Sequence, residues 1–327
     1  METTIIVSYD AGWGSSLSIR GGEPLNWESG TRMESEGPHT WTLQLDLEDP
    51  LEFKPLLNDE LWAFGHRDYR VEPGETVHLR PHFLPTPGWA DAIGYIPFRG
   101  RDITVRLYTP PGYRENSQRR YPVVYCLDGQ SLFEPQGAHA DWHLDDHLNA
   151  LIESRTVEPM LLVGVDFLEP GLSPESLDFE ATAQQFGPFI LKLKETIDRG
   201  YPTLPEPEQS VLVGAAWGGL FALKFGLEHP DRFGRLAALA PSFAWAGGEA
   251  LAQAVPSSPL GSQKVYLDGT SPSPEGVEGL AGALRAAGWV EGETFDFEPI
   301  DPEGPRAVEW ARRIGSPLRF LLPWSGR

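Results

Sequence analysis

The middle of the chain contains a turn of the kind that presents a nucleophile. The run V-L-V-G-A-A-W-G-G-L-F-A-L-K-F-G (211–226) reads as a strand, a glycine-flanked turn and a helix. Written G-x-S-x-G, such a turn exposes a serine, and its glycines let the strand and the helix approach closely. The glycines are present as Gly214, Gly218 and Gly219, but the central residue is Ala216. A methyl group has no attacking oxygen, so this residue cannot form an acyl intermediate.

The segments around this turn alternate between strand-like and helix-like patterns. Unbroken apolar runs, typical of strands covered on both faces, occupy 121–129, 159–167, 210–216, 235–243 and 264–270. Helix-like segments separate or follow them at 141–154, 182–201, 218–230, 275–289 and 306–322. Residues 101–113 alternate, as an outer antiparallel strand would. The pattern predicts a mostly parallel sheet with helices on both faces, which binds ligands outside the carboxyl ends of its strands.

Residues 1–83 follow a different pattern. Apolar and polar residues alternate between turn formers at 15–22, 40–47, 51–59 and 75–83. Nothing in this part has helical period, so we expect a small all-β, immunoglobulin-like sandwich. The stretch rich in proline and glycine that follows predicts a linker over 84–96, and the α/β domain is expected over 97–327.

Composition limits the classes of function. The 327 residues are 40% hydrophobic, enough for two cores, and carry a formal net charge of −21. This acidic balance argues against nucleic acid and anionic membrane surfaces as partners. The start M-E-T-T-I-I-V-S-Y-D lacks a signal-peptide pattern, and Cys126, in an apolar run, is the only cysteine. We therefore expect a cytoplasmic protein without disulfides, membrane spans or cofactors.

Five short pieces occur in a fixed order along the second part of the chain. They are D-G-Q at 128–130, W-x-x-D at 142–145, the turn at 214–218, H-P-x-x-F-G at 229–234 and S-F-x-W at 242–245. Together they resemble the esterase D family of α/β-hydrolases, which includes enterochelin esterase-like proteins. The resemblance runs from about residue 100 to the C-terminus and implies the α/β-hydrolase fold.

The resemblance also implies how the pocket would be built. The backbone N–H of Trp217, after the nucleophile position, would bind an oxyanion, and the loop near Gln130 would supply a second donor. Trp217, Phe243 and Trp245 would surround the mouth of the site. An apolar, aromatic-lined hollow of this kind suits a small-molecule ligand.

The base and acid positions of the implied triad carry other residue types in this chain. In this family they follow the nucleophile in the order acid, then histidine, yet no histidine lies beyond His229. The family's G-x-H segment falls where this chain has Pro305, which has no titratable group. The acid position falls near Pro272, with Asp268 and Glu275 as nearby stand-ins.

Loss of several catalytic residues favours a hydrolase fold that has lost hydrolysis over a single engineered replacement. The leading hypothesis is a non-catalytic protein that binds an ester-like or glycan-like small molecule, or a protein partner. The alternative is an ester hydrolase with an atypical or engineered-out site at Ala216. In that case oxyanion donors would polarise a carbonyl for attack by water.

Three histidines recur every fourth residue, at His139, His143 and His147, with aspartates among them. This spacing stacks side chains on one helix face and is compatible with zinc. His139 is expected to precede the helix, and no further ligand is evident, so we interpret the cluster as a solvated helix face and expect no metal.

The N-terminal part resembles the sandwich modules related to starch-binding domains. The resemblance rests on L-N-W ending at Trp27, on Phe53 and Lys54, and on Trp62. It implies that Lys54 and Trp62 line a sugar platform, which gives a glycan-binding protein as a further alternative. We interpret Trp27 as structural. The simpler interpretation of this domain is that it packs against the hydrolase domain and shapes its cleft.

Overall fold

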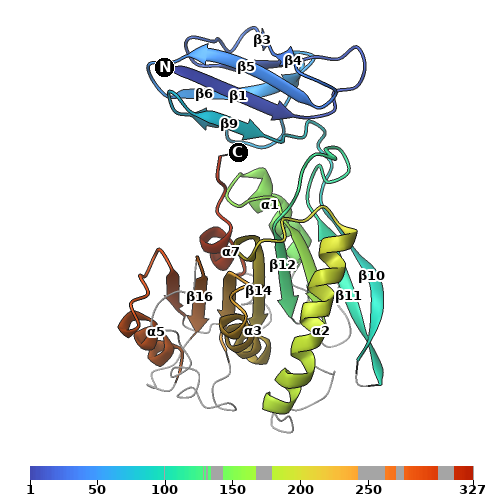
Figure 1. The fold of residues 1–327 in the computed structure, drawn as a ribbon, viewed down its shortest axis with the longest axis vertical. Coiled ribbons are helices and arrows are strands. Elements are labelled where there is room, and N and C mark those ends of the chain that lie inside the picture. The colour runs from blue at the N-terminus through green and yellow to red at the C-terminus, as the bar shows by residue number, and fades with distance from the viewer. Residues whose placement is uncertain are drawn as a thin grey trace.

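The computed structural model describes residues 1–98, 100–127, 129, 132–133, 143–166, 179–241, 262–269, 276–300 and 313–326. A β-rich N-terminal part lies at one end of the molecule and an α/β part at the other (Figure 1). The C-terminus returns to the N-terminal part (Figure 1). Among the described residues, no helix is both long and apolar enough to cross a membrane.

The N-terminal part consists of two sheets that share one core. Its strands are β1 (Glu2–Ser8), β2 (Leu17–Gly21), β3 (Thr31–Arg32), β4 (Glu34–Ser35), β5 (Thr40–Asp46), β6 (Leu51–Leu57), β7 (Leu61–Trp62), β8 (Tyr69–Val71) and β9 (Thr76–Leu79). One sheet has the order β4-β5-β1-β9, and the other has β3-β2-β6-β7 with β8 paired to β6. Alternate residues of β1, such as Ile5 and Val7, are buried in the shared core. The β-rich character agrees with the sequence, while the immunoglobulin-like assignment stays a prediction.

The α/β part is built on an eight-stranded sheet with the order β10-β11-β13-β12-β14-β15-β16-β17. The strands are β10 (Trp89–Phe98), β11 (Arg101–Thr109), β12 (Val123–Leu127), β13 (Leu161–Val165), β14 (Ser210–Ala215), β15 (Arg235–Leu239), β16 (Lys264–Gly269) and β17 (Phe295–Pro299). Strand β11 is antiparallel to both neighbours, and β12 to β17 run parallel. The apolar runs predicted the mostly parallel sheet, and the alternating residues 101–113 predicted an antiparallel strand beside it, although β10 and not β11 is the outer strand.

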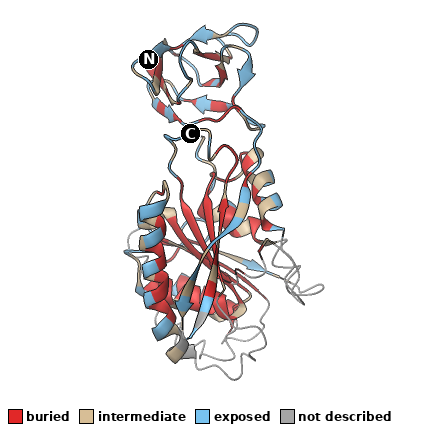
Figure 2. Ribbon diagram, turned by 90° about the vertical axis from the view of Figure 1, so that its right-hand side faces the viewer, coloured by how far each residue is buried: buried red, intermediate tan, exposed pale blue. Residues whose placement is uncertain are grey.

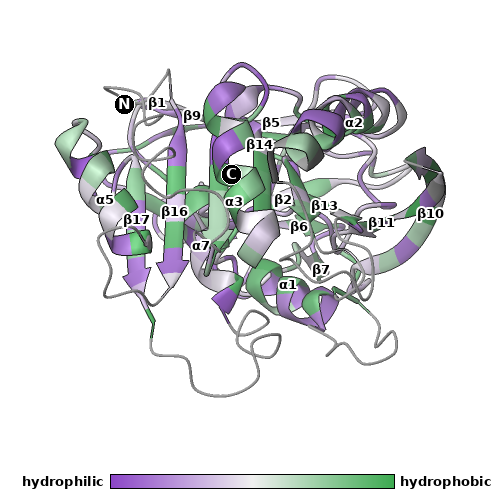
Figure 3. Ribbon diagram, turned by 90° about the horizontal axis from the view of Figure 1, so that it is seen from below, coloured by the Kyte–Doolittle hydropathy of each residue, from purple (hydrophilic) through white to green (hydrophobic). Residues whose placement is uncertain are grey.

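Helices cover both faces of this sheet. They are α1 (Leu144–Glu153), α2 (Phe179–Gly200), α3 (Ala216–Glu228), α5 (Val277–Ala286) and α7 (Gly315–Leu321), with a 3₁₀ helix at Pro207–Gln209. Residues of α2, α3 and α5 share one hydrophobic cluster, and residues of α1 and α7 share a second one. Seen from below, α1 and α2 lie on opposite sides of the strands (Figure 3). The central strands between these layers are buried (Figure 2).

Three details differ from the sequence-based expectations. Residues 89–96 of the expected linker belong to β10, an exposed edge strand that tolerates a proline and a register shift beside Gly94. Strand β17 was not predicted, because its short, partly polar sequence lacks an apolar run. Helix α1 begins at Leu144, so His143 is the residue that precedes it, with a left-handed φ of 44°.

The N-terminal part contacts the α/β part at the amino ends of the parallel strands. The Asn116 amide, ahead of β12, donates to the carbonyl oxygens of Ser8 at 3.0 Å and Pro81 at 2.8 Å. The Tyr9 hydroxyl donates to Glu115 at 3.0 Å. These contacts lie at the end of the sheet opposite to the turn at Ala216, because that turn follows the carboxyl end of β14. The N-terminal part therefore packs against the α/β part as expected, but at the end of the sheet opposite to that turn (Figure 1).

Arg155 is the most buried cation of this interface, with 5% of its surface exposed. Its guanidinium donates to the carbonyl oxygens of Phe64, at 2.8 Å, and Arg67. It also lies 3.9 Å from the centre of the Tyr69 ring and 5.2 Å from that of Trp324. One side chain thus links strand β8, the loop after β7 and the C-terminal segment.

Candidate functional site

The turn between β14 and α3 keeps the backbone of a nucleophile turn. Ala216 has a φ of 47°, a left-handed conformation that costs a non-glycine residue about 1–2 kcal/mol. Ala215, just before it, is extended, with φ −111° and ψ 153°. A strained residue at this point persists only because the surrounding packing imposes its conformation.

The packing that imposes the turn is a close approach of strand and helix. A Cβ added to Gly214 would lie 2.3 Å from the carbonyl carbon of Gly218 and 2.8 Å from the nitrogen of Gly219. A Cβ on Gly219 would lie 2.9 Å from the Gly214 oxygen. Both positions therefore require glycine, as the sequence indicated. Gly218 is buried between them.

The side chain at the tip of the turn faces accessible space. Within residues 211–220, Ala216 is partly exposed, and every other residue is buried. The turn therefore presents the methyl group of Ala216 where a serine would present its oxygen. By contrast, the Trp217 side chain is 1% exposed and lies in the core cluster of α2 and α3, rather than at an open rim.

Asp268 lies at the same end of the parallel strands as the turn. Ala215 pairs with Leu239 of β15, and Leu239 pairs with Asp268 of β16. Two strand spacings put the Cα atoms of Ala215 and Asp268 about 10 Å apart. Although it precedes the family's acid position in sequence, Asp268 is thus brought to the carboxyl end of a strand near the candidate site.

The Asp268 carboxyl group is fully buried and faces a cation. The Ala240 N–H donates to Oδ1 at 2.7 Å, and the Arg313 guanidinium lies 3.3 Å from the same oxygen. Among the described residues, Oδ2 has no hydrogen-bond partner. Burial raises the pKa of Asp268 to about 7, although Arg313 and the Ala240 N–H both act to lower it. A carboxyl group held in this way can bind a proton near neutral pH.

A second acidic contact lies beside it. The Tyr266 hydroxyl donates to Glu298 of β17 at 2.7 Å, and burial raises the pKa of Tyr266 far above its usual range. Glu298 also contributes to the raised pKa of Asp268. The charged partner of Asp268 is therefore the guanidinium of Arg313, just ahead of α7, and not an imidazole.

The described histidines lie in three places. His229 follows α3 at its C-terminal end, 13 residues after Ala216 and hence about 20 Å away. Four others, His39, His66, His78 and His82, belong to the N-terminal part, and burial lowers the pKa of His82 to about 3. His143 and His147 lie at the start of α1, where both are exposed. Among the described residues, no group of three or more His, Cys, Asp or Glu side chains is arranged for a metal ion.

The remaining residues proposed for this site lie outside the described part of the chain. They are Gln130, Phe243, Trp245, Pro272, Glu275 and Pro305. Their predicted roles in the oxyanion hole, the rim and the triad positions remain predictions.

The two residues proposed to bind sugar differ in accessibility. The Lys54 ammonium donates to the Gly65 carbonyl at 2.8 Å and lies 3.6 Å from Asp68, with 13% of the side chain exposed. Lys54 is therefore engaged within the domain. Trp62 is 38% exposed, and its ring centre lies 6.2 Å from that of Trp27, which is 41% exposed. The interpretation of Trp27 as structural is thus incomplete, because its ring is also accessible.

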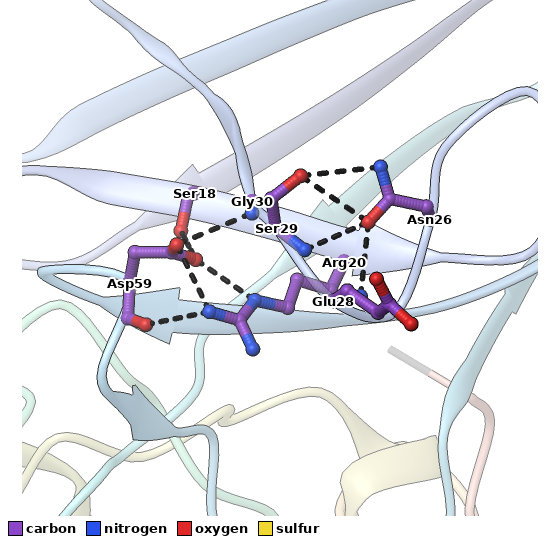
Figure 4. Close-up of polar contacts among 7 residues, drawn as sticks. All are labelled: Ser18, Arg20, Asn26, Glu28, Ser29, Gly30 and Asp59. Carbon is purple, nitrogen blue, oxygen red and sulfur yellow. Dashed lines mark hydrogen bonds and ion pairs between the residues drawn. The ribbon is translucent and has the colours of Figure 1, made fainter.

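Arg20 supports this pair of rings. Its guanidinium lies 5.3 Å from the centre of the Trp62 ring and is held by Asp59 through contacts of 3.0 and 2.9 Å (Figure 4). Asp59 also accepts from the Ser18 hydroxyl and the Gly30 N–H, and Arg20 helps lower the pKa of Asp59 to about 2. These contacts hold the loop between β6 and β7 in place, and β7 carries Trp62.

Comparison with known proteins gives the family of this chain. The model of the family Esterase, described as "Putative esterase", matches residues 98–284, more than half of the chain. The chain belongs to the Esterase family. The predicted resemblance to this family is thereby confirmed for the α/β part.

Among curated relatives of this Esterase-family chain, the iron(III) enterobactin esterase of Dickeya dadantii (strain 3937) is 29% identical over 147 residues. That match covers 42% of this chain and 30% of the relative, so it spans less than a third of the relative's length.

Solved structures share the fold. The ferric enterobactin esterase of Salmonella typhimurium aligns with 94% of this chain and 88% of its own, at 15% identity and a TM-score of 0.51. An IroE-like serine hydrolase from Shewanella oneidensis aligns with 72% of this chain and 80% of its own, at 19% identity and a TM-score of 0.54. A ferulic acid esterase from Anaeromyces mucronatus aligns with 71% of this chain and 89% of its own, at 16% identity and a TM-score of 0.51. At these identities the likeness shows the esterase fold alone.

Proposed function

We propose that this member of the Esterase family binds an ester-like small molecule beside the β14–α3 turn without hydrolysing it. The observation that carries the proposal is the retained turn: Ala216 keeps a left-handed φ of 47° and partial exposure, yet offers only a methyl group. A hydrolase needs an ionisable oxygen at that point. The pairing of Asp268 with Arg313 at 3.3 Å supports the same conclusion, because it occupies the buried acid with a cation that cannot relay a proton.

The names of the relatives suggest the first ligands to test. The curated relative is named for iron(III) enterobactin, and one solved relative from Shigella flexneri was determined with 2,3-dihydroxy-N-benzoylglycine. Esters and amides of aromatic acids are therefore the ligand class that we propose.

The experiment compares turnover and binding in the same protein. We expect no hydrolysis of p-nitrophenyl butyrate above a heat-treated control, either by the unaltered protein or after Ala216→Ser, because an unactivated hydroxyl is a poor nucleophile at neutral pH. Calorimetric titration with 2,3-dihydroxy-N-benzoylglycine is expected to show saturable binding. Ala216→Leu should weaken this binding by placing bulk at the exposed tip, and Ala286→Leu, on the exposed side of α5, is the matched control.

The outcomes separate this proposal from its enzymatic alternative. Saturable turnover by the unaltered protein would favour an esterase that uses oxyanion donors and water, for which binding and electrostatics alone leave about 10³–10⁴-fold acceleration. Robust turnover only after Ala216→Ser would mean that a base is present and the nucleophile alone is missing. Absence of both turnover and binding would remove the proposed ligand class.

A second function, glycan binding by the N-terminal part, is favoured by the exposed Trp27–Trp62 pair. Aromatic rings with one accessible face can stack on the apolar faces of sugars. Retarded migration in gels containing amylose or glycogen, lost after Trp62→Ala or Trp27→Ala, would support it. Trp13→Ala is the control, since Trp13 is fully exposed elsewhere in the same part. Unchanged migration of the unaltered protein would exclude this function for these glycans.

A further inference from the structure

A cleft of about 360 Å³ lies where the N-terminal part meets the amino ends of the parallel strands. Arg80, after β9, lines one side, and Arg119 and Arg120, ahead of β12, line another. Arg235, the first residue of β15, also lines it, as do Leu321, Leu322, Pro323 and Ser325 of the C-terminal segment. The cleft is at the amino ends of the strands and Ala216 is at their carboxyl ends, so the cleft is separate from the site proposed above.

The charge of this cleft contrasts with that of the whole chain. Four arginines line it, whereas the chain as a whole has a formal charge of −21. Two carboxylates also line it: Glu158 accepts from the Ser325 N–H at 2.6 Å, and Glu208 accepts from the Ser262 hydroxyl and acts on Arg235 through its charge. Across the described part of the chain, no carboxylate lies within 4.0 Å of any of these four guanidinium groups. The lining therefore carries four cations against two carboxylates, so its charge is positive in a strongly acidic chain.

Two of the arginines are held in place by backbone contacts. Nη1 of Arg235 donates to the Ser262 carbonyl at 2.6 Å, while its buried Nε has no hydrogen-bond partner within the described residues. Nη1 of Arg119 donates to the Arg80 carbonyl at 3.1 Å, and its guanidinium lies 5.7 Å from the centre of the Tyr121 ring. These contacts use one N–H donor of each guanidinium group and fix the orientation of that group, which leaves its other N–H groups for a ligand.

The positive charge acts on neighbouring groups. The pKa of His82 is lowered to about 3, first by burial and then by Arg119 and Arg155. Burial also lowers the pKa of Arg235, with Glu208 opposing it. Both effects have the sign expected where cations gather and are partly desolvated.

We propose that this cleft binds a small polyanion, a molecule with two or more phosphate or carboxylate groups. Guanidinium groups bind both kinds of oxyanion through paired N–H donors, and a concave, partly desolvated site strengthens that attraction. A volume of about 360 Å³ is in the range of small-molecule sites and too small for a macromolecular segment of any length. Because the lining comes from both parts of the chain and from the C-terminal segment, the bound anion would also hold these three together.

The test is calorimetric titration of the full chain with pyrophosphate and, separately, with citrate. We expect saturable binding of one molecule per chain for at least one of them, and the two titrations distinguish a phosphate-bearing ligand from a polycarboxylate. Arg80→Gln/Arg120→Gln, two exposed arginines of the cleft, should weaken binding at least about tenfold. Arg199→Gln, on α2 and outside the cleft, should leave it unchanged.

The variants chosen also protect the test against misfolding, because both cleft side chains are exposed and neither forms an ion pair among the described residues. Binding should weaken as sodium chloride is raised at constant pH. Absence of saturable heat with both anions, or equal weakening by Arg199→Gln, would overturn the proposal. These results do not depend on whether the β14–α3 turn binds an ester.

Discussion

The carboxylate of Asp268 lies 3.3 Å from the guanidinium of Arg313, at the carboxyl ends of the parallel strands, where Ala216 also lies. Asp268 is the penultimate residue of the buried strand β16, and Arg313 lies just ahead of α7, 45 residues further along the chain. In a hydrolase of this architecture, a buried acid at a strand end would orient an imidazole. Here its charged partner is a permanent cation, which supports a structural role for the acid.

Replacing Asp268 should change how stability depends on pH. Burial raises its pKa to about 7 from the ordinary value of 3.8, so the folded protein holds one more proton than the unfolded chain between these values. The stability that this proton contributes is present below pH 3.8 and is lost as pH rises to 7, by about 4 kcal/mol in all. The unfolding free energy of Asp268→Asn minus that of the unaltered protein should therefore rise from pH 4 to pH 8.

Urea unfolding at several pH values measures this difference. Asp231→Asn, at a side chain that is 72% exposed, provides the reference for a surface carboxylate. A difference for Asp268→Asn that falls with pH would contradict the account.

Removing Arg313 should be costly mainly above neutral pH. At pH 8 the carboxylate of Asp268 is charged, and Arg313→Gln leaves it buried without its cation, at a cost of about 3 kcal/mol. At pH 5 the folded protein holds Asp268 protonated, so the loss should be about 1 kcal/mol. An equal loss at both pH values, measured by urea unfolding, would show that Arg313 acts through other contacts.

The glycine before the turn should be intolerant of a methyl group. Gly214→Ala places Cβ 2.3 Å from a backbone carbon of α3, so strand and helix must separate, at an expected cost of about 3 kcal/mol or more. The matched control is Gly282→Ala in α5, where no atom lies within 4 Å, and there we expect a gain of about 0.5–1 kcal/mol. Thermal unfolding compares the two. A harmless Gly214→Ala would mean that the turn is not held by this close approach.

The link between the two parts of the chain should depend on a planar cation. Arg155→Lys keeps the charge but loses the paired N–H donors to Phe64 and Arg67 and the stacking on Tyr69 at 3.9 Å. We expect a loss of about 2 kcal/mol and separation of the thermal transition into two steps. Arg199→Lys, exposed on α2, is the control. A single unshifted transition would show that Arg155 does not couple the parts.

Much of the fold could be predicted from local sequence pattern. The apolar runs at 121–129 and 210–216 became β12 and β14, because a strand covered on both faces must be apolar throughout. The edge strands β10 and β17 lack that signal, since one is largely exposed and the other is short and partly polar. Turn residues at 84–96 therefore predicted a linker where residues 89–96 belong to a strand.

The site could be predicted only in part. The G-x-A-x-G pattern identified Ala216, because glycine spacing is a local property of the chain. The partnership of Asp268 with Arg313 depends on which strand end meets which helix, and no local pattern specifies that. The edge of the sheet on which the N-terminal part docks is likewise a tertiary property, set by contacts such as Asn116 to Ser8.

The central claim, that no proton relay serves the β14–α3 turn, is tested most directly by intact-mass measurement of Ala216→Ser after incubation with a fluorophosphonate. This reagent labels a serine only when a neighbouring base activates it. The account predicts that the mass of Ala216→Ser stays unchanged, like that of the unaltered protein. One stoichiometric adduct on Ala216→Ser, absent from the unaltered protein, would contradict it.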